Sequence, residues 1–203
     1  MNIKVKPMGS YQTNCYILTI NNKDFIIDPG IDASKWVLDN ISNPKAIFNT
    51  HGHFDHVWSN QELKDRLKIP IYCPKDDAFM LKEDPFHLGT PKSNPDFLVE
   101  DNQIIEIEGE KFKFITFKGH SPGCSVIEFN NIWFSGDFLF KNSIGRWDLP
   151  FSNPKDMLNS LKRLKKDYNN INKTLLPGHG PKSSLKEELK YIDYWIEVVK
   201  RDI

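Results

Sequence analysis

The sequence predicts an α+β fold in which strands pair into sheets and helices lie outside them. Three observations support this prediction. Short apolar and β-branched runs, bounded by turn signals, recur along most of the chain and are typical of strands. Two amphipathic stretches near the C-terminus have the spacing of helices. A Pro-rich segment at residues 84–101 has no periodicity, so we expect a long loop there.

The first half of the chain carries strand signals that alternate with shorter helical signals. We expect strands over residues 3–5, 16–20, 25–27, 46–48 and 69–72, with a hairpin turn at 21–24. Asp32 is placed to cap a short helix that runs to about Ile41. Val57, Leu63 and Leu67 fall roughly on one helical face, which indicates a second helix after His56.

The second half repeats the strands and then ends in helices. We expect strands over residues 104–107, 112–117, 125–129, 132–134 and 174–176. Asn153 followed by Pro154 is typical of a helix start, with the asparagine as the N-cap residue. Ser184 and Glu187 have the spacing of a capping box, which predicts the start of the last helix.

Composition limits the class of protein. The 203 residues suit a single domain over 1–203, and 27 basic residues balance 27 acidic ones, which counts against a nucleic-acid partner. The apolar runs are too short to span a bilayer, and the N-terminus does not resemble a signal peptide. Three widely spaced cysteines predict no disulfide framework and favour a reducing compartment. We therefore expect a cytoplasmic protein without a membrane partner; its oligomeric state is not predicted.

Three of the six histidines lie within six residues, in the stretch from Thr50 to His56. Imidazole nitrogens and carboxylate oxygens are the usual ligands of zinc and similar metals. His51 and His53 alternate at the end of a strand, so both can face one side. A turn after them would carry Asp55 and His56 to an adjacent site. Four ligands exceed what one open catalytic metal needs, which makes two metals plausible.

Three further ligand candidates lie in turns at strand ends. His120, Asp137 and His179 each follow a predicted strand and have a glycine beside them. Glycine permits tight backbone turns at these points. We expect the fold to bring these three residues together with the histidine motif.

These motifs occur in order along nearly the whole chain, and in them the sequence resembles the metallo-β-lactamase fold superfamily. Within it, the short bacterial type of glyoxalase II-like hydrolase is the most similar group. The motifs are Thr13-Asn14-Cys15, Asp28-Pro29-Gly30, His51-Gly52-His53-Phe54-Asp55-His56, Gly119-His120-Ser121-Pro122-Gly123, Ser135-Gly136-Asp137, Gly145-Arg146-Trp147-Asp148-Leu149-Pro150 and Pro177-Gly178-His179-Gly180.

The resemblance implies an αββα sandwich of two mixed β-sheets flanked by helices. It also implies two divalent transition-metal ions, with zinc expected and iron or manganese as alternatives. The implied ligands are His51, His53 and His120 for the first metal, Asp55, His56 and His179 for the second, and Asp137 as a bridge. Asp55 and Asp137 would be the catalytic carboxylates, and Asp28 would orient ligands by hydrogen bonds.

The implied reaction is hydrolysis of a small-molecule thioester, such as a hydroxyacylglutathione, through a metal-bound hydroxide. Arg146 and Lys141 are expected to bind the thiol half of the substrate, although Arg146 could instead pair with Asp148. Only 24 residues follow His179, where full-length glyoxalase II enzymes carry a helical domain that helps to bind glutathione. The identity of the thiol half of the substrate is therefore not predicted. The alternatives are a persulfide dioxygenase with one iron, which the Gly123-Cys124 pair resembles, and a lactone or β-lactam hydrolase.

Overall fold

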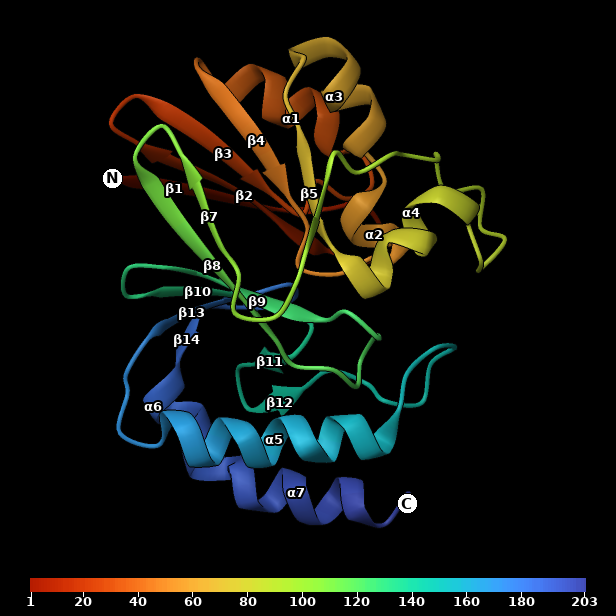
Figure 1. The fold of residues 1–203 in the computed structure, drawn as a ribbon, viewed down its shortest axis with the longest axis vertical. Coiled ribbons are helices and arrows are strands. Elements are labelled where there is room, and N and C mark those ends of the chain that lie inside the picture. Colours follow the sequence, from red (N-terminus) through yellow and green to blue (C-terminus); the bar gives the residue numbers. More distant parts are fainter. The chain divides into compact units, whose positions relative to one another are not determined.

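The computed structural model describes residues 1–203, which divide into two compact units, residues 1–99 and 100–203. Each unit contains a six-stranded mixed β-sheet together with helices (Figure 1). Two mixed sheets with flanking helices confirm the predicted fold class. A single domain over 1–203 stays a prediction.

The sheet of the first unit has the strand order β1-β2-β3-β4-β5-β6. Its strands are β1 (Asn2–Met8), β2 (Thr13–Ile20), β3 (Lys23–Ile27), β4 (Pro44–Phe48), β5 (Ile71–Pro74) and β6 (Phe97–Val99). β1, β2 and β3 pair antiparallel, whereas β3 to β6 run parallel. The helices of this unit are α1 (Ala33–Asn40), α2 (Phe54–Val57), α3 (Asn60–Leu67) and α4 (Ala78–Glu83), with a 3-10 turn at Lys75–Asp77.

The core of the first unit forms where the parallel strands meet the helices. Ile26, Ile47 and Ile71 come from three neighbouring strands, and none is exposed to solvent. They belong to one apolar cluster with Val37 of α1 and Leu63 of α3. Parallel strands are buried on both faces and therefore appear as continuous apolar runs, which is why these short strands were recognisable from sequence.

The sheet of the second unit has the order β14-β13-β10-β9-β8-β7. Its strands are β7 (Ile104–Ile107), β8 (Glu110–Thr116), β9 (Ser125–Phe129), β10 (Ile132–Gly136), β13 (Thr174–Pro177) and β14 (Ser183–Ser184). Only β10 and β13 pair parallel. A small hairpin joins β11 (Leu139–Phe140) and β12 (Ser143–Ile144), and the helices are α5 (Pro154–Tyr168), α6 (Leu185–Glu188) and α7 (Ile192–Lys200), with a 3-10 turn at Leu189–Tyr191.

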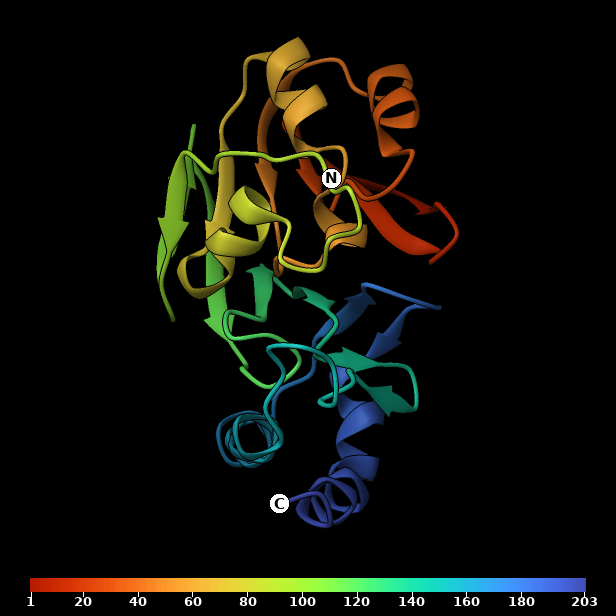
Figure 2. The same cartoon turned by 90° about the vertical axis from the view of Figure 1, so that its right-hand side faces the viewer.

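The helices α5 and α7 lie side by side in both views of the molecule (Figures 1 and 2). Leu161 of α5 and Val199 of α7 belong to one buried apolar cluster, which also includes Trp133 of the sheet. Lys165 pairs with Asp193 across the outer side of the two helices. The amphipathic patterns seen in the sequence therefore correspond to packed helix faces.

The predicted helix caps had mixed outcomes. The side chain of Asn153 accepts a hydrogen bond from the Asp156 N–H, and Ser184 accepts one from the Glu187 N–H, so both predicted starts are confirmed. Asp32 does precede α1, but its side chain makes no capping bond. Its backbone lies in the left-handed region, with φ of 64°, rather than in the extended conformation of an ordinary N-cap.

Three segments differ from the sequence-based expectation. The single helix expected after His56 is divided into α2, which begins at Phe54 and ends at Val57, and α3, which begins at Asn60; Asp55 and His56 therefore lie in α2 and not in a turn. The expected loop at 84–101 contains β6, which is only three residues long and is defined by pairing with β5. The last helix is divided into α6 and α7 by the 3-10 turn. No helix of the structure combines the length and the apolar character needed to cross a bilayer.

Candidate metal centre

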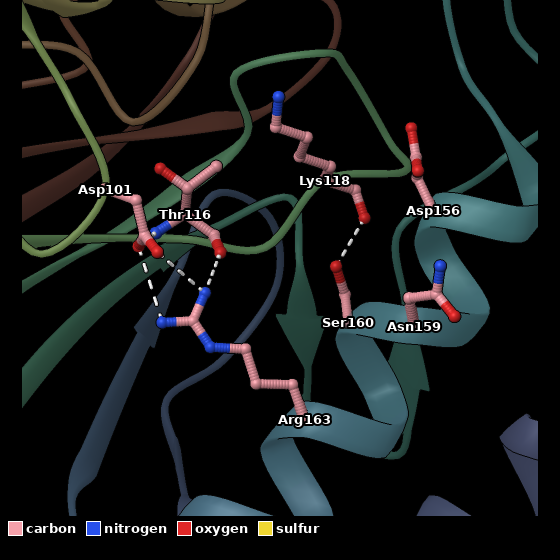
Figure 3. A pocket seen from close by; sticks show the side chains of 7 residues that line it. All are labelled: Asp101, Thr116, Lys118, Asp156, Asn159, Ser160 and Arg163. Carbon is pink, nitrogen blue, oxygen red and sulfur yellow. Dashed lines mark hydrogen bonds and ion pairs between the residues drawn. The ribbon is translucent and has the colours of Figure 1, made fainter.

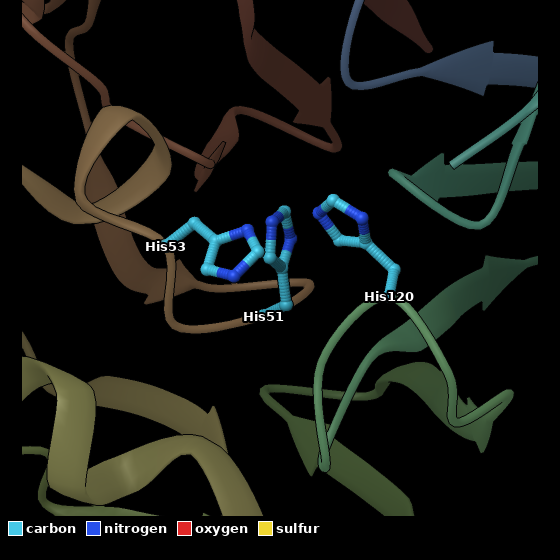
Figure 4. A group of neighbouring side chains, drawn as sticks. All are labelled: His51, His53 and His120. Carbon is cyan, nitrogen blue, oxygen red and sulfur yellow. The ribbon is translucent and has the colours of Figure 1, made fainter. Parts of the chain in front are cut away.

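In the first unit, the candidate ligands lie in the segment that follows β4 and in α2. His51 and His53 come from the connecting segment (Figure 4), while Asp55 and His56 come from α2 itself. The ring centroids of His51 and His53 are 4.8 Å apart, and those of His51 and His56 are 4.1 Å apart. All four side chains are buried. The local motif therefore gathers nitrogen and oxygen donors in one place, as its spacing predicted.

A buried carboxylate at the end of β3 connects two of these histidines. Asp28 accepts hydrogen bonds from the Thr50 N–H at 2.8 Å and from the Thr50 hydroxyl at 2.6 Å. The Nδ1 atom of His56 lies 3.0 Å from the same carboxylate. The ligand-type atoms of Asp28, His51 and His56 lie within 4.8 Å of one another. Asp28 is thus placed to orient neighbouring rings, although this role stays a prediction.

These hydrogen bonds determine which ring nitrogen of His51 and of His56 is available to bind a metal ion. Because the Thr50 hydroxyl donates to the carboxylate of Asp28, it can accept from the Nδ1 atom of His51, 3.0 Å away. The Nδ1 atom of His56 likewise donates to Asp28, since a carboxylate only accepts. Both rings then carry their proton on Nδ1 and present the Nε2 lone pair, the arrangement typical of metal-binding histidines.

Two further residues, Thr13 and Asp77, orient this half of the site, and no such role was predicted for either from the sequence. The Thr13 hydroxyl donates to the Asp55 carboxylate at 2.6 Å. The buried carboxylate of Asp77 accepts from the N–H of Gly52, which stands between His51 and His53. Neither contact has a local sequence signal, because the partners lie 42 and 25 residues apart.

In the second unit, three candidate ligands come from three separate strand ends. His120 follows β8 (Figure 4), Asp137 follows β10 and His179 follows β13. One carboxylate oxygen, Oδ2 of Asp137, lies 3.4 Å from Nε2 of His120 and 3.4 Å from Nε2 of His179. His120 is buried, whereas the side chain of His179 is 29% exposed. A single carboxylate therefore faces both histidines, as a bridging ligand requires.

The segment that follows β12 supports the turn of His120. The Nδ1 atom of His120 lies 2.9 Å from the carbonyl oxygen of Arg146. A carbonyl oxygen only accepts, so His120 carries its proton on Nδ1 and presents Nε2, like His51 and His56. A Cβ atom on Gly145 would lie 1.7 Å from the Asp137 carbonyl oxygen, so only glycine fits there.

The two predicted substrate-binding side chains are both exposed. The guanidinium of Arg146 forms a two-pronged ion pair with Asp148, with N–O distances of 2.8 and 2.9 Å. The Arg146–Asp148 pair is the alternative to substrate binding that was predicted from the sequence. Lys141 lies at the tip of the β11–β12 hairpin and lines a surface hollow of about 550 Å³ together with Lys182 and Tyr191. Substrate binding by Arg146 and Lys141 stays a prediction.

A second hollow on this unit, of about 230 Å³, has a structural explanation (Figure 3). Arg163 of α5 crosses it, donates to the Thr116 carbonyl oxygen at 2.9 Å and pairs with Asp101 at 3.1 Å. Ser160 donates to the carbonyl oxygen of Lys118. These bonds attach α5 to the sheet, and the lining includes no histidine.

The donor set fits divalent transition-metal ions. It consists of imidazole nitrogens and carboxylate oxygens, which suit zinc, iron and manganese. The three cysteines are buried and do not belong to the groups of side chains that could hold an ion. Burial raises the pKa of the Cys15 and Cys73 thiols well above the ordinary value. Thiolate ligands are therefore disfavoured there.

Comparison with known proteins agrees with the fold and the donor set. Residues 8–179 match the Metallo-beta-lactamase superfamily, and the chain belongs to that superfamily. It is 30% identical to the hydroxyacylglutathione hydrolase GloC of Haemophilus influenzae, over 93% of this chain and 95% of that protein. Among solved structures, the BLEG-1 B3 metallo-beta-lactamase has a TM-score of 0.82 at 28% identity, covering 95% of this chain and 99% of that one. TTHA1623, solved in a di-iron-bound form, has a TM-score of 0.78 at 31% identity, covering 91% and 96%.

Proposed function

We propose that this metallo-hydrolase cleaves a thioester with two divalent metal ions. His51, His53 and His120 would hold one ion, Asp55, His56 and His179 would hold the other, and Asp137 would bridge them. The observation that carries the proposal is the position of the Asp137 carboxylate, with one oxygen 3.4 Å from both His120 and His179. A carboxylate between two potential metal ligands is what a two-metal site needs.

The side chains around the ligands have defined tasks in this reaction. Bound metal ions would supply a nucleophilic hydroxide at neutral pH and polarise the carbonyl group under attack. Thr13 donates to one oxygen of Asp55 and so keeps that carboxylate in a fixed orientation, in which it would hold a metal ion and orient the attacking hydroxide. Asp28 and Thr50 keep His51 and His56 in the Nδ1–H tautomer. No serine or cysteine nucleophile is required.

A thioester suits this site because the leaving thiol has a pKa of about 8.5 and departs without a strong general acid. The relative from Haemophilus influenzae is described as a hydroxyacylglutathione hydrolase, which supports a 2-hydroxyacyl thioester as the substrate class. Lys141 is exposed at the hairpin tip and is the candidate to bind a negatively charged thiol half. The relative in a di-iron-bound form supports iron beside zinc as the metal.

The test begins with protein purified without added metal. We expect about two transition-metal ions per chain by elemental analysis. The protein should hydrolyse a hydroxyacyl thioester. In a separate assay with a persulfide as substrate, it should take up no oxygen. His53→Ala should lose metal and activity, whereas His87→Ala, which changes an exposed loop histidine, should keep both. One iron per chain at saturation, with oxygen uptake on the persulfide, would overturn the proposal in favour of a dioxygenase.

A further inference from the structure

The segment 145–153 forms three hydrogen bonds with the turn that carries His120 and also lies against Asp137. The carbonyl oxygen of Arg146 accepts from the His120 ring, and Gly145 lies against the backbone of Asp137. The Ser152 hydroxyl donates to the His120 carbonyl oxygen at 2.9 Å, and the Asn153 N–H donates to the Gly119 carbonyl oxygen at 2.8 Å. The ring of His120 is thus oriented by a backbone carbonyl, whose direction depends on the conformation of this segment.

The side chain of Arg146 pairs with Asp148 and so closes a short loop, residues 146–148, in the same segment. Its Nε and Nη2 atoms each donate to a different oxygen of Asp148, two residues further on. Isolated surface ion pairs stabilise proteins little, and these side chains are 66% and 63% exposed. Two parallel bonds, however, restrict geometry far more than one contact does. Trp147, which lies between Arg146 and Asp148 in sequence, is partly buried against the core and donates to Asp202. These contacts attach the short loop to the rest of the unit.

We propose that the Arg146–Asp148 pair is a positioning device for His120. By closing the loop it fixes the direction of the Arg146 carbonyl group, which holds the proton of His120 on Nδ1 and leaves Nε2 for a metal ion. The proposal rests on the proposed role of His120 as a ligand. It also gives the guanidinium a task other than binding the thiol half of a substrate, because both of its bonds in the structure go to Asp148.

The experiment compares Arg146→Ala, Asp148→Ala, the double variant and Arg146→Lys. Metal affinity is measured by competition with a chelator, and the Nδ1–H signal of His120 is followed by NMR in metal-free protein near pH 8. We expect each alanine variant to weaken metal binding about three- to tenfold, less than the loss of a direct outer-shell partner. The Nδ1–H signal should exchange faster in both. The double variant should be no worse than either single one.

The kinetic comparison separates positioning from substrate binding. A positioning role predicts that kcat/KM falls by the same factor for anionic and uncharged thioesters, and that Arg146→Lys recovers part of it. A substrate clamp predicts that only Arg146→Ala raises KM, only for anionic thioesters, and that Asp148→Ala is harmless or improves binding. The second pattern, with unchanged metal affinity, would overturn the proposal.

A matched control removes a similarly exposed ion pair elsewhere. Arg66→Ala breaks the pair with Glu62 on α3, whose side chains are 57% and 56% exposed, and should leave every measurement unchanged. If wild-type protein binds no metal, the proposed function fails. The NMR comparison in metal-free protein still tests the positioning, because an unchanged Nδ1–H signal in both alanine variants would contradict it.

Discussion

The two units hold their candidate ligands in different ways. In the first unit, four candidates lie within six residues and are oriented by side chains, chiefly Asp28 and Thr13. In the second unit, His120, Asp137 and His179 lie 17 and 42 residues apart in sequence. There the orienting group on His120 is a backbone carbonyl, and Gly145 permits its close approach.

This difference predicts which substitutions disturb the arrangement of the candidate ligands in each unit. A site oriented by side chains is disturbed by changing one carboxylate or hydroxyl group, while the backbone stays in place. A site oriented by the backbone is insensitive to most side-chain changes, but it fails when an added atom displaces the chain. Changing an orienting carboxylate should therefore disturb the first unit, whereas a close approach of a glycine to the backbone of a candidate ligand occurs in both units.

The largest effect is expected from adding one methyl group at the two close backbone approaches. A Cβ atom on Gly30 would lie 1.9 Å from the Asp55 carbonyl oxygen, and one on Gly145 would lie 1.7 Å from that of Asp137. Because a backbone atom must move in each case, we expect Gly30→Ala and Gly145→Ala each to lower the free energy of unfolding by about 3 kcal/mol. Denaturant titration and metal content measure the outcome.

The control for this pair is Gly89→Ala, where a Cβ atom meets nothing within 4 Å. Its backbone has φ of 78°, so only the conformational cost of about 1 kcal/mol is expected. Gly30 and Gly145 do not have positive φ, so their expected loss comes from close approach alone, and a loss at Gly89→Ala as large as that at Gly145→Ala would contradict this explanation. Loss of metal should accompany only Gly30→Ala and Gly145→Ala, which lie against Asp55 and Asp137.

The next effect compares ligands within the second unit. Asp137→Ala should lower kcat/KM more than about a hundredfold, a larger loss than that of an orienting residue, and should reduce metal content below one ion per chain. His179→Ala should lose less, because His179 would hold one ion in the proposed site, whereas Asp137 faces both histidines. Equal metal loss and equal residual activity in the two variants would argue against a bridging carboxylate.

A smaller effect is expected from changing the orienting carboxylate of the first unit. Asp28→Asn keeps the shape of the side chain but removes the charge that the Thr50 hydroxyl and His56 donate to. We expect metal affinity to fall about ten- to a hundredfold, the range for outer-shell partners. Chelator competition measures this, and an affinity equal to that of the unchanged protein would show that Asp28 is only structural.

The smallest effect concerns a buried carboxylate of the same unit that lies outside the motif. Burial raises the pKa of Asp24, but hydrogen bonds from Thr19, Asn43 and Ser42 outweigh it, so the pKa lies below its ordinary value. A lowered folded-state pKa means that this contribution to stability is complete above the unfolded pKa of about 3.9 and is lost as pH falls through the folded value.

Asp24→Asn should therefore cost about 1 kcal/mol near neutral pH and reduce the loss of stability below pH ~4. Unfolding followed from pH 3 to pH 7 tests this, with metal-free protein so that ligand loss does not interfere. Metal affinity should not change. A drop in affinity like that of Asp28→Asn would mean that burial of any carboxylate in this sheet matters, and that Asp28 has no special role.

The sequence by itself determined the features that depend on neighbours along the chain. The stretch from Thr50 to His56 holds four candidate ligands, so its chemistry was visible without a structure. The caps at Asn153 and Ser184 were predicted for the same reason, since each bonds an N–H three residues ahead. The parallel strands were also recognisable from local sequence, because strands buried on both faces consist of continuous apolar residues.

Tertiary structure alone decided the contacts between residues that are distant in sequence. Asp77 holds Gly52 from 25 residues away, and the three residues of β6 form a strand only because β5 pairs with them. The partner of His120 is the carbonyl group of Arg146, which every residue type possesses. Side-chain identity encodes neither the position of a carbonyl group nor the partner of a short strand, so folding had to supply both.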